Sequence, residues 1–273
     1  MASAPPFNGK ADGDELAAVC AAVVTHLESL EGVRNVQLAP CVGARQGALH
    51  AWERHNYPAQ LPAELRAFYE LSDGLSLTWS VEHMGDELPL GCMHVNDLKR
   101  LVRADIDPAE LRTSSVPASG RSRSPPFISI GADGGQGLMA FDLDSTVYDG
   151  QLCLLYCLPA TDSPQVWFQD LSRAWYFVAG SFGDYLRLVL MHLGLPRWQH
   201  AYTDVGLDPT AKQWIRLFAP HRLEARAEFE DPGARARSRR PTAGASKAHS
   251  SNGRTSALFR PPAHAQSSAA RGV

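Results

Sequence analysis

Two carboxylates near the middle of the chain have a type and spacing that could carry phosphoryl-transfer chemistry. Asp142 and Asp144 follow an apolar run, 138–141, and are followed in turn by the hydroxyl of Thr146. In such chemistry Asp142 would attack phosphorus and Asp144 would protonate the leaving group, while a magnesium ion neutralised the crowded negative charge. The same chemistry also requires a downstream lysine and a further acidic pair to hold the metal.

The segment resembles the first motif of haloacid-dehalogenase-type phosphatases, but the other parts of that machinery are hard to find. Lys212 is the only lysine after Asp144 in the part of the chain expected to fold, and Asp184 is expected to start a helix. The motif also follows several expected strands, instead of lying on the first strand of a parallel sheet. We therefore predict a hairpin, with strands at 138–143 and 151–158 joined by a turn, and keep a phosphatase using Asp142 and Asp144 as the alternative.

The glycine-rich segment, the histidines and the cysteines show no pattern typical of a functional site. We therefore predict no catalytic residue, no cofactor site and no metal site. The glycine-rich segment 131–137 lacks the Lys-Ser/Thr pair of a P-loop, and no helix pattern follows it, so we expect a turn. No histidine pair has helical spacing with an acid, and Cys153-x3-Cys157 has no second pair at ligand spacing. Cys92 and Cys153 lie in apolar segments, where a thiol is usually inert.

Charge divides the chain into an acidic body and a basic tail. Of the 26 basic and 29 acidic residues, eight basic and no acidic residues lie between Pro232 and Val273. The body, with the other 18 basic and all 29 acidic residues, therefore carries −11, and the tail carries +8. After about residue 222 the apolar pattern stops, so burial cannot offset the ~1–2 kcal/mol per residue that backbone ordering costs. We expect residues 1–11 and 223–273 to be disordered.

Cysteine usage and hydropathy predict a cytosolic protein. The five cysteines are an odd number, and residues 1–11 lack the apolar run of a secretory signal, so we expect free thiols. No stretch approaches the ~18 apolar residues that a membrane span needs.

Apolar periodicity predicts helices that flank a run of mostly antiparallel strands, which is an α+β fold. Residues 12–222 are numerous enough for one core, and we predict that they form a single domain. A Ser181–Asp184 capping box predicts one helix start, and Asp208 before Pro209 predicts another. The expected helices cover about 14–30, 62–72, 182–193 and 209–219. The expected strands cover about 33–38, 75–80, 88–95, 127–130, 138–143, 152–158 and 166–168.

Three short motifs in the first hundred residues resemble the signature of the SUKH superfamily. They are Trp52-Glu53, then Leu61-Pro62 at a helix start, and Asp73-Gly74 at the end of that helix. This superfamily includes yeast cell-wall-assembly regulators and many bacterial toxin-immunity proteins. The resemblance implies a SUKH-like domain, with the late segment 182–186 as its closing helix.

Longer stretches resemble one particular family, that of tubulin polyglutamylase complex subunit 2. They are 77–81, 89–91, 192–199 and 211–214, and the similarity extends from about residue 16 to residue 220. The resemblance implies a non-catalytic accessory subunit, with ligation done by a separate tubulin-tyrosine-ligase-like glutamylase. It also implies tubulin as a partner and a location at microtubules, at the centriole or the cilium base. A SUKH-type regulatory module with an unrelated partner is a further alternative.

The resemblance and the charge pattern together indicate two groups of residues, one with a structural role and one that could bind a partner. We expect a mainly structural role for the family-motif residues Trp52, Glu53, Leu61, Pro62, Gly74, Trp79, Pro89 and Gly91. Candidate partner-binding residues are Trp198, Gln199, Lys212, Trp214, Arg235, Arg237, Arg239 and Arg240. The tail arginines would attract acidic tubulin tails over about a Debye length, ~8 Å at cell salt. A solubilising tail is the plain alternative, and nucleic acid is a weaker one because Phe259 is the only aromatic residue among these charges.

Overall fold

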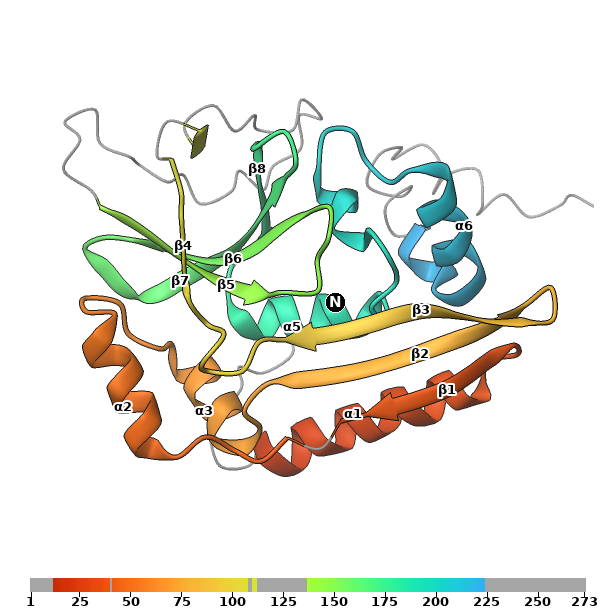
Figure 1. The fold of residues 1–273 in the computed structure, drawn as a ribbon, viewed down its shortest axis with the longest axis horizontal. Coiled ribbons are helices and arrows are strands. Elements are labelled where there is room, and N and C mark those ends of the chain that lie inside the picture. The colour runs from red at the N-terminus through yellow and green to blue at the C-terminus, as the bar shows by residue number, and fades with distance from the viewer. Residues whose placement is uncertain (1–11, 40, 108–109, 112–136, 224–273) are drawn as a thin grey trace, which may run out of the picture.

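Two antiparallel sheets with helices around them make up the described part of the chain (Figure 1). The computed structural model describes residues 12–39, 41–107, 110–111 and 137–223. The expected strand at 127–130 and most of the expected glycine turn lie outside these ranges, as do residues 1–11 and the tail beyond 223. The α+β class and the antiparallel pairing of the strands are confirmed.

The first sheet contains three strands in the order β1-β2-β3, all antiparallel. Its strands are β1 (Val33–Leu38), β2 (Leu75–His83) and β3 (Asp86–Val95). Three helices belong to this half of the chain, α1 (Asp12–Ser29), α2 (Gln46–His55) and α3 (Ala63–Leu71). The predicted alternation in β2 is confirmed, because Leu75, Leu77 and Trp79 are all buried.

The second sheet contains five antiparallel strands in chain order. They are β4 (Arg103–Ala104), β5 (Leu138–Asp144), β6 (Gly150–Cys157), β7 (Ala160–Asp170) and β8 (Trp175–Ala179). The chain then forms α5 (Phe182–Met191), a 3-10 turn η1 (Trp198–Tyr202) and α6 (Pro209–Phe218). Helix α5 contacts α3 of the first half and β7 and β8 of the second, so it joins the two halves.

Side-chain caps fix the starts of the last two helices, as the sequence predicts. The Ser181 hydroxyl accepts a hydrogen bond from the Asp184 amide at 3.2 Å. Asp208 accepts from the amides of Thr210 and Ala211 at 2.8 and 2.9 Å, and these bonds, with that from Ala211 first, lower the pKa of its carboxyl. Pro62 lies one residue before α3, and not at the first helical position that we predicted.

Three elements of the structure were not predicted from the sequence. They are the helix α2 and the strands β4 and β8, and the strands together form two sheets. A single cluster of buried apolar side chains nevertheless includes residues of both sheets, such as Trp79 of β2 and Phe141 of β5. The division into a single domain and flanking segments stays a prediction.

Asn96 joins the two sheets at the end of β3. Its backbone amide donates to the Leu143 carbonyl at 2.9 Å, and its side-chain amide donates to the Asp142 carbonyl at 3.0 Å. Its side-chain oxygen accepts from the Ser145 amide at 3.1 Å. Asn96 is fully buried, so these bonds are shielded from water and fix the first sheet against the β5 end of the second.

Candidate functional site

The family-motif residues are used mainly for contacts inside the chain. The Trp52 indole donates to the Leu101 carbonyl at 2.8 Å, and the Trp79 indole donates to the Leu193 carbonyl at 2.9 Å. Gly74 has a φ of +103°, which favours glycine, and it ends the α3 segment where the chain enters β2. Pro89 lies in β3 beside the register shift that follows Trp79, where its missing amide breaks no regular ladder.

The two candidate phosphatase carboxylates lie in a tight hairpin, as we predicted. Asp142 and Asp144 are on β5, which pairs antiparallel with β6, opposite Cys153 and Leu152. One Asp144 oxygen accepts from both the amide and the hydroxyl of Thr146, at 2.9 and 2.6 Å, and so closes the turn. Burial raises the pKa of both carboxyls, with the charge of Asp144 contributing at Asp142. In the described ranges, no three His, Cys, Asp or Glu side chains are grouped so that they could hold a metal ion.

Burial also raises the pKa of the thiols of Cys92 and Cys153. A thiol with a raised pKa has little thiolate at neutral pH, so neither side chain has the character of a nucleophile. All five cysteines of the chain are free.

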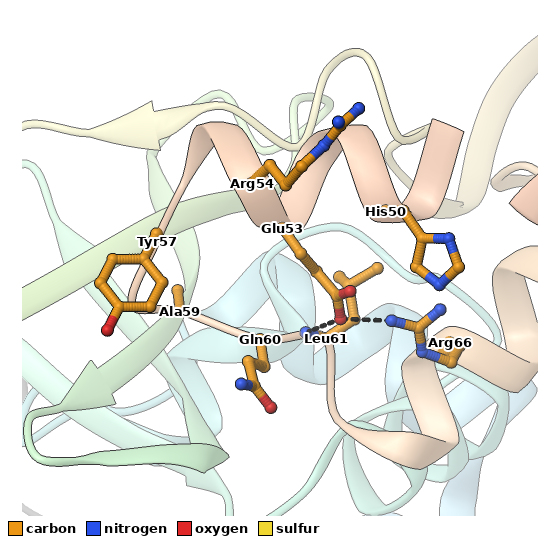
Figure 2. Close-up of a pocket in the computed structure, with 8 residues that line it drawn as sticks. All are labelled: His50, Glu53, Arg54, Tyr57, Ala59, Gln60, Leu61 and Arg66. Atoms are coloured by element: carbon orange, nitrogen blue, oxygen red, sulfur yellow. Dashed lines mark hydrogen bonds and ion pairs between the residues drawn. The ribbon is translucent and has the colours of Figure 1, made fainter. Parts of the chain in front are cut away.

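A polar pocket of about 510 Å³ lies between α2 and the start of α3 (Figure 2). The α2 segment faces the core with Leu49 and Trp52 and turns its other face to the pocket. The side chains that line it and can form hydrogen bonds are His50, Glu53, Arg54, Tyr57, Gln60 and Arg66.

A carboxylate with two partners lies at the centre of this pocket. One Glu53 oxygen accepts from the Leu61 amide at 3.2 Å and from the Arg66 guanidinium, with which it forms an ion pair. Figure 2 shows both bonds and shows the Arg54 guanidinium pointing away from Glu53, on the outer side of α2. Glu53 therefore fixes the segment before α3, and the other polar groups remain around it.

The predicted partner-binding residues lie in three different environments. Trp198 and Gln199 are interior residues, 3% and 6% exposed, and Trp198 stacks on His192 with ring centroids 4.8 Å apart. This burial corrects the expectation that they face a partner, since the folded chain leaves neither accessible. Lys212 is exposed on α6, and Trp214 is half-buried against His83 and Phe218. The arginines at 235, 237, 239 and 240 lie outside the described residues.

The sequence reasoning missed most of the pocket residues, because the helix that carries them was not predicted. The spacing of His50, Glu53 and Tyr57, three and four residues apart, places them on one helical face. Arg54 directly follows Glu53 and points to the outer side of the helix. This polar spacing, opposite Leu49 and Trp52, was the available signal. Arg66 comes from α3 and could be added only by the fold.

The fold and the pocket define a class of protein, an α+β chain with two packed antiparallel sheets and a polar pocket on its surface. None of the described helices combines the length and the apolar content needed to cross a membrane. No protein-family model matches the chain, so the SUKH resemblance stays a prediction, and no solved structure matches it either.

Comparison with characterised proteins gives the particular family. Tubulin polyglutamylase complex subunit 2 of Rattus norvegicus is 29% identical over 249 residues, which cover 85% of this chain and 81% of the relative. The proteins of the same name from Mus musculus and Homo sapiens are each 31% identical over 71% of this chain, and cover 68% and 67% of the relatives. The chain belongs to the tubulin polyglutamylase complex subunit 2 family.

Proposed function

We propose that this protein is a non-catalytic accessory subunit of a tubulin polyglutamylase complex. The observation that carries the proposal is the 31% identity to relatives with that name, over about two thirds of their length. The hairpin at Asp142 and Asp144 supports a non-catalytic role, because Asp144 is buried and closes a turn. The glutamate ligation is then done by a separate tubulin-tyrosine-ligase-like subunit.

In this role the protein holds the ligase and tubulin together, so its contribution is an increased effective concentration of one for the other. Lys212 and Trp214 on α6, together with the basic tail, are the candidate contact residues that remain after Trp198 and Gln199 are placed in the interior. The complex would act in the cytoplasm at microtubules, including those of the centriole or the cilium base.

Affinity purification of the tagged chain from ciliated cells, followed by mass spectrometry, tests the proposal. We expect tubulin, a tubulin-tyrosine-ligase-like enzyme and further subunits to be recovered, and we expect the isolated chain to attach no glutamate to tubulin. Recovery of neither the ligase nor tubulin would contradict the proposal. Magnesium-dependent phosphatase turnover that is lost in Asp142→Asn would instead support the hydrolase alternative.

Removal of residues 232–273 is expected to weaken co-pelleting with microtubules at least threefold at low salt. The deletion removes a charge of +8, and the attraction of such a segment for acidic tubulin tails extends over ~30 Å at 0.01 M salt but only ~8 Å at 0.15 M. The difference between the full chain and the deletion should therefore shrink as salt is added. A tail of the same length with its eight basic residues changed to glutamine is the control, and pelleting equal to that of the native chain would refute the electrostatic role.

A further inference from the structure

We infer that the pocket between α2 and α3 binds the carboxylates of a glutamate-rich peptide. The inference rests on the proposed function and names a site within it. Four properties of the pocket support this inference. They are its free hydrogen-bond donors, the compensated charge of Glu53, the local charge balance and the size of the cavity.

Donors outnumber acceptors among the groups that remain free in the pocket. Arg66 uses one terminal nitrogen for Glu53, and no bond from its other guanidinium nitrogens is found in the described ranges. Arg54, which is exposed, has no hydrogen bond or ion pair with any described residue, and the same holds for the side chains of His50 and Gln60. A guanidinium group binds a carboxylate with two parallel N–H bonds, so these arginines are suited to such a ligand.

The acid in the pocket does not oppose this binding strongly. Glu53 is held by the Leu61 amide and paired with Arg66, so its negative charge is already compensated. The Arg54 charge has no such partner, and its guanidinium points to the outer side of α2, so it adds positive charge at the edge of the pocket.

The pocket is a basic spot on an acidic body. The described residues include 24 acidic and 13 basic side chains. Within 41–66, by contrast, the stretch that ends with the pocket residue Arg66, three arginines and two histidines accompany only two acidic residues, Glu53 and Glu64. An acidic peptide is therefore repelled by most of this surface and attracted here, which favours binding at one place.

The size and lining of the cavity suit a peptide side chain. A volume of about 510 Å³ lies within the ~300–1,000 Å³ typical of small-ligand pockets. Tyr57, at the opposite end from His50 in Figure 2, is 81% exposed and offers an aromatic face to the methylene groups of glutamate. A glutamate side chain in the cavity could thus place its carboxylate on Arg66, while a neighbouring glutamate of the same peptide lies toward Arg54 on the outer side of α2.

Binding of a fluorescein-labelled hexaglutamate peptide to the full-length chain, measured by fluorescence anisotropy, tests the inference. Arg54→Glu is expected to weaken binding about tenfold or more, which corresponds to ~1.4 kcal/mol. The matched control is Arg216→Glu on α6, an exposed arginine with no ion pair among the described residues. Both variants change the net charge equally, so general attraction by the basic tail affects them alike. The milder variant His50→Ala should lose twofold to threefold, and hexaglutamine should not bind.

Each other outcome overturns the inference. Equal effects of Arg54→Glu and Arg216→Glu, in chains with unchanged thermal unfolding, would show attraction by charge alone. An oligothymidylate of equal charge that binds as tightly and depends equally on Arg54 would show a general polyanion site. If the native chain recovers the ligase from cells but does not bind hexaglutamate, the inference fails while the proposed function stands. If no ligase is recovered, the proposed function fails.

Discussion

Gly91→Ala is expected to lower the free energy of unfolding by about 3 kcal/mol or more, at the severe end of overpacking substitutions. A Cβ atom at this position would lie 1.8 Å from the Trp79 indole nitrogen and 2.2 Å from the adjacent ring carbon. Trp79 is fully buried and cannot move away without losing its hydrogen bond to the Leu193 carbonyl and its edge contact with Phe218. Urea unfolding followed by tryptophan fluorescence would measure the loss.

Gly47→Ala is the matched control for this change. Gly47 lies in α2, and no atom would come within 4 Å of an added Cβ atom. Alanine has the higher helix propensity, so this variant should be neutral or more stable by up to ~1 kcal/mol. If Gly91→Ala were as stable as Gly47→Ala, the result would show that Gly91 does not pack closely against Trp79.

Acidification from pH 7 to pH 4 is expected to remove up to about 3 kcal/mol of stability through His192 alone. Burial lowers the pKa of His192 to about 4, from about 6.5 in the unfolded chain. Its Nδ1 lies 2.8 Å from the Leu188 carbonyl and its Nε2 faces Arg222, as suits a neutral ring. Between these two pKa values the unfolded chain binds more protons, so this contribution is complete above about pH 6.5 and is lost as the pH falls toward 4.

The measurement compares denaturant unfolding of the native chain and His192→Gln across this pH range. The difference between them isolates His192, because the buried carboxyls of Asp142 and Asp144, whose raised pKa values act in the opposite direction, are present in both chains. His55→Gln, which removes an exposed imidazole of α2, is the matched control variant. A native chain with the same pH slope as His192→Gln would show that the ring titrates normally.

Local signals made several elements predictable from the sequence. Ser181 and Asp208 bond to amides two or three residues away, and such bonds depend on neighbours in the chain alone. The strict alternation of Leu75, Leu77 and Trp79 likewise identifies β2. Strand β8 was missed because Trp175–Ala179 is a short apolar run without alternation, which does not distinguish a strand from a buried helix segment.

The rest of the fold depends on contacts between distant residues. The division into two sheets is fixed where Asn96 meets Asp142 and Leu143, nearly fifty positions later, and no local pattern encodes that pairing. The pocket is similar, because Arg66 reaches Glu53 only when α2 and α3 fold against each other. Conversely, Trp198 was a candidate partner-binding residue from its motif alone, whereas in the fold it is buried and stacked on His192.

The order of synthesis matters for a chain built in this way. The carboxylate of Glu64 on α3 accepts from the Gly183 amide at the start of α5 at 2.8 Å, and the Trp79 indole donates to Leu193, 114 residues later. Translation delivers the first sheet before either late partner, so the nascent N-terminal half leaves the ribosome with a large aromatic surface uncovered. We expect this stage to need chaperone protection, and truncations that stop before α5 to be degraded instead of accumulating as a stable half-protein.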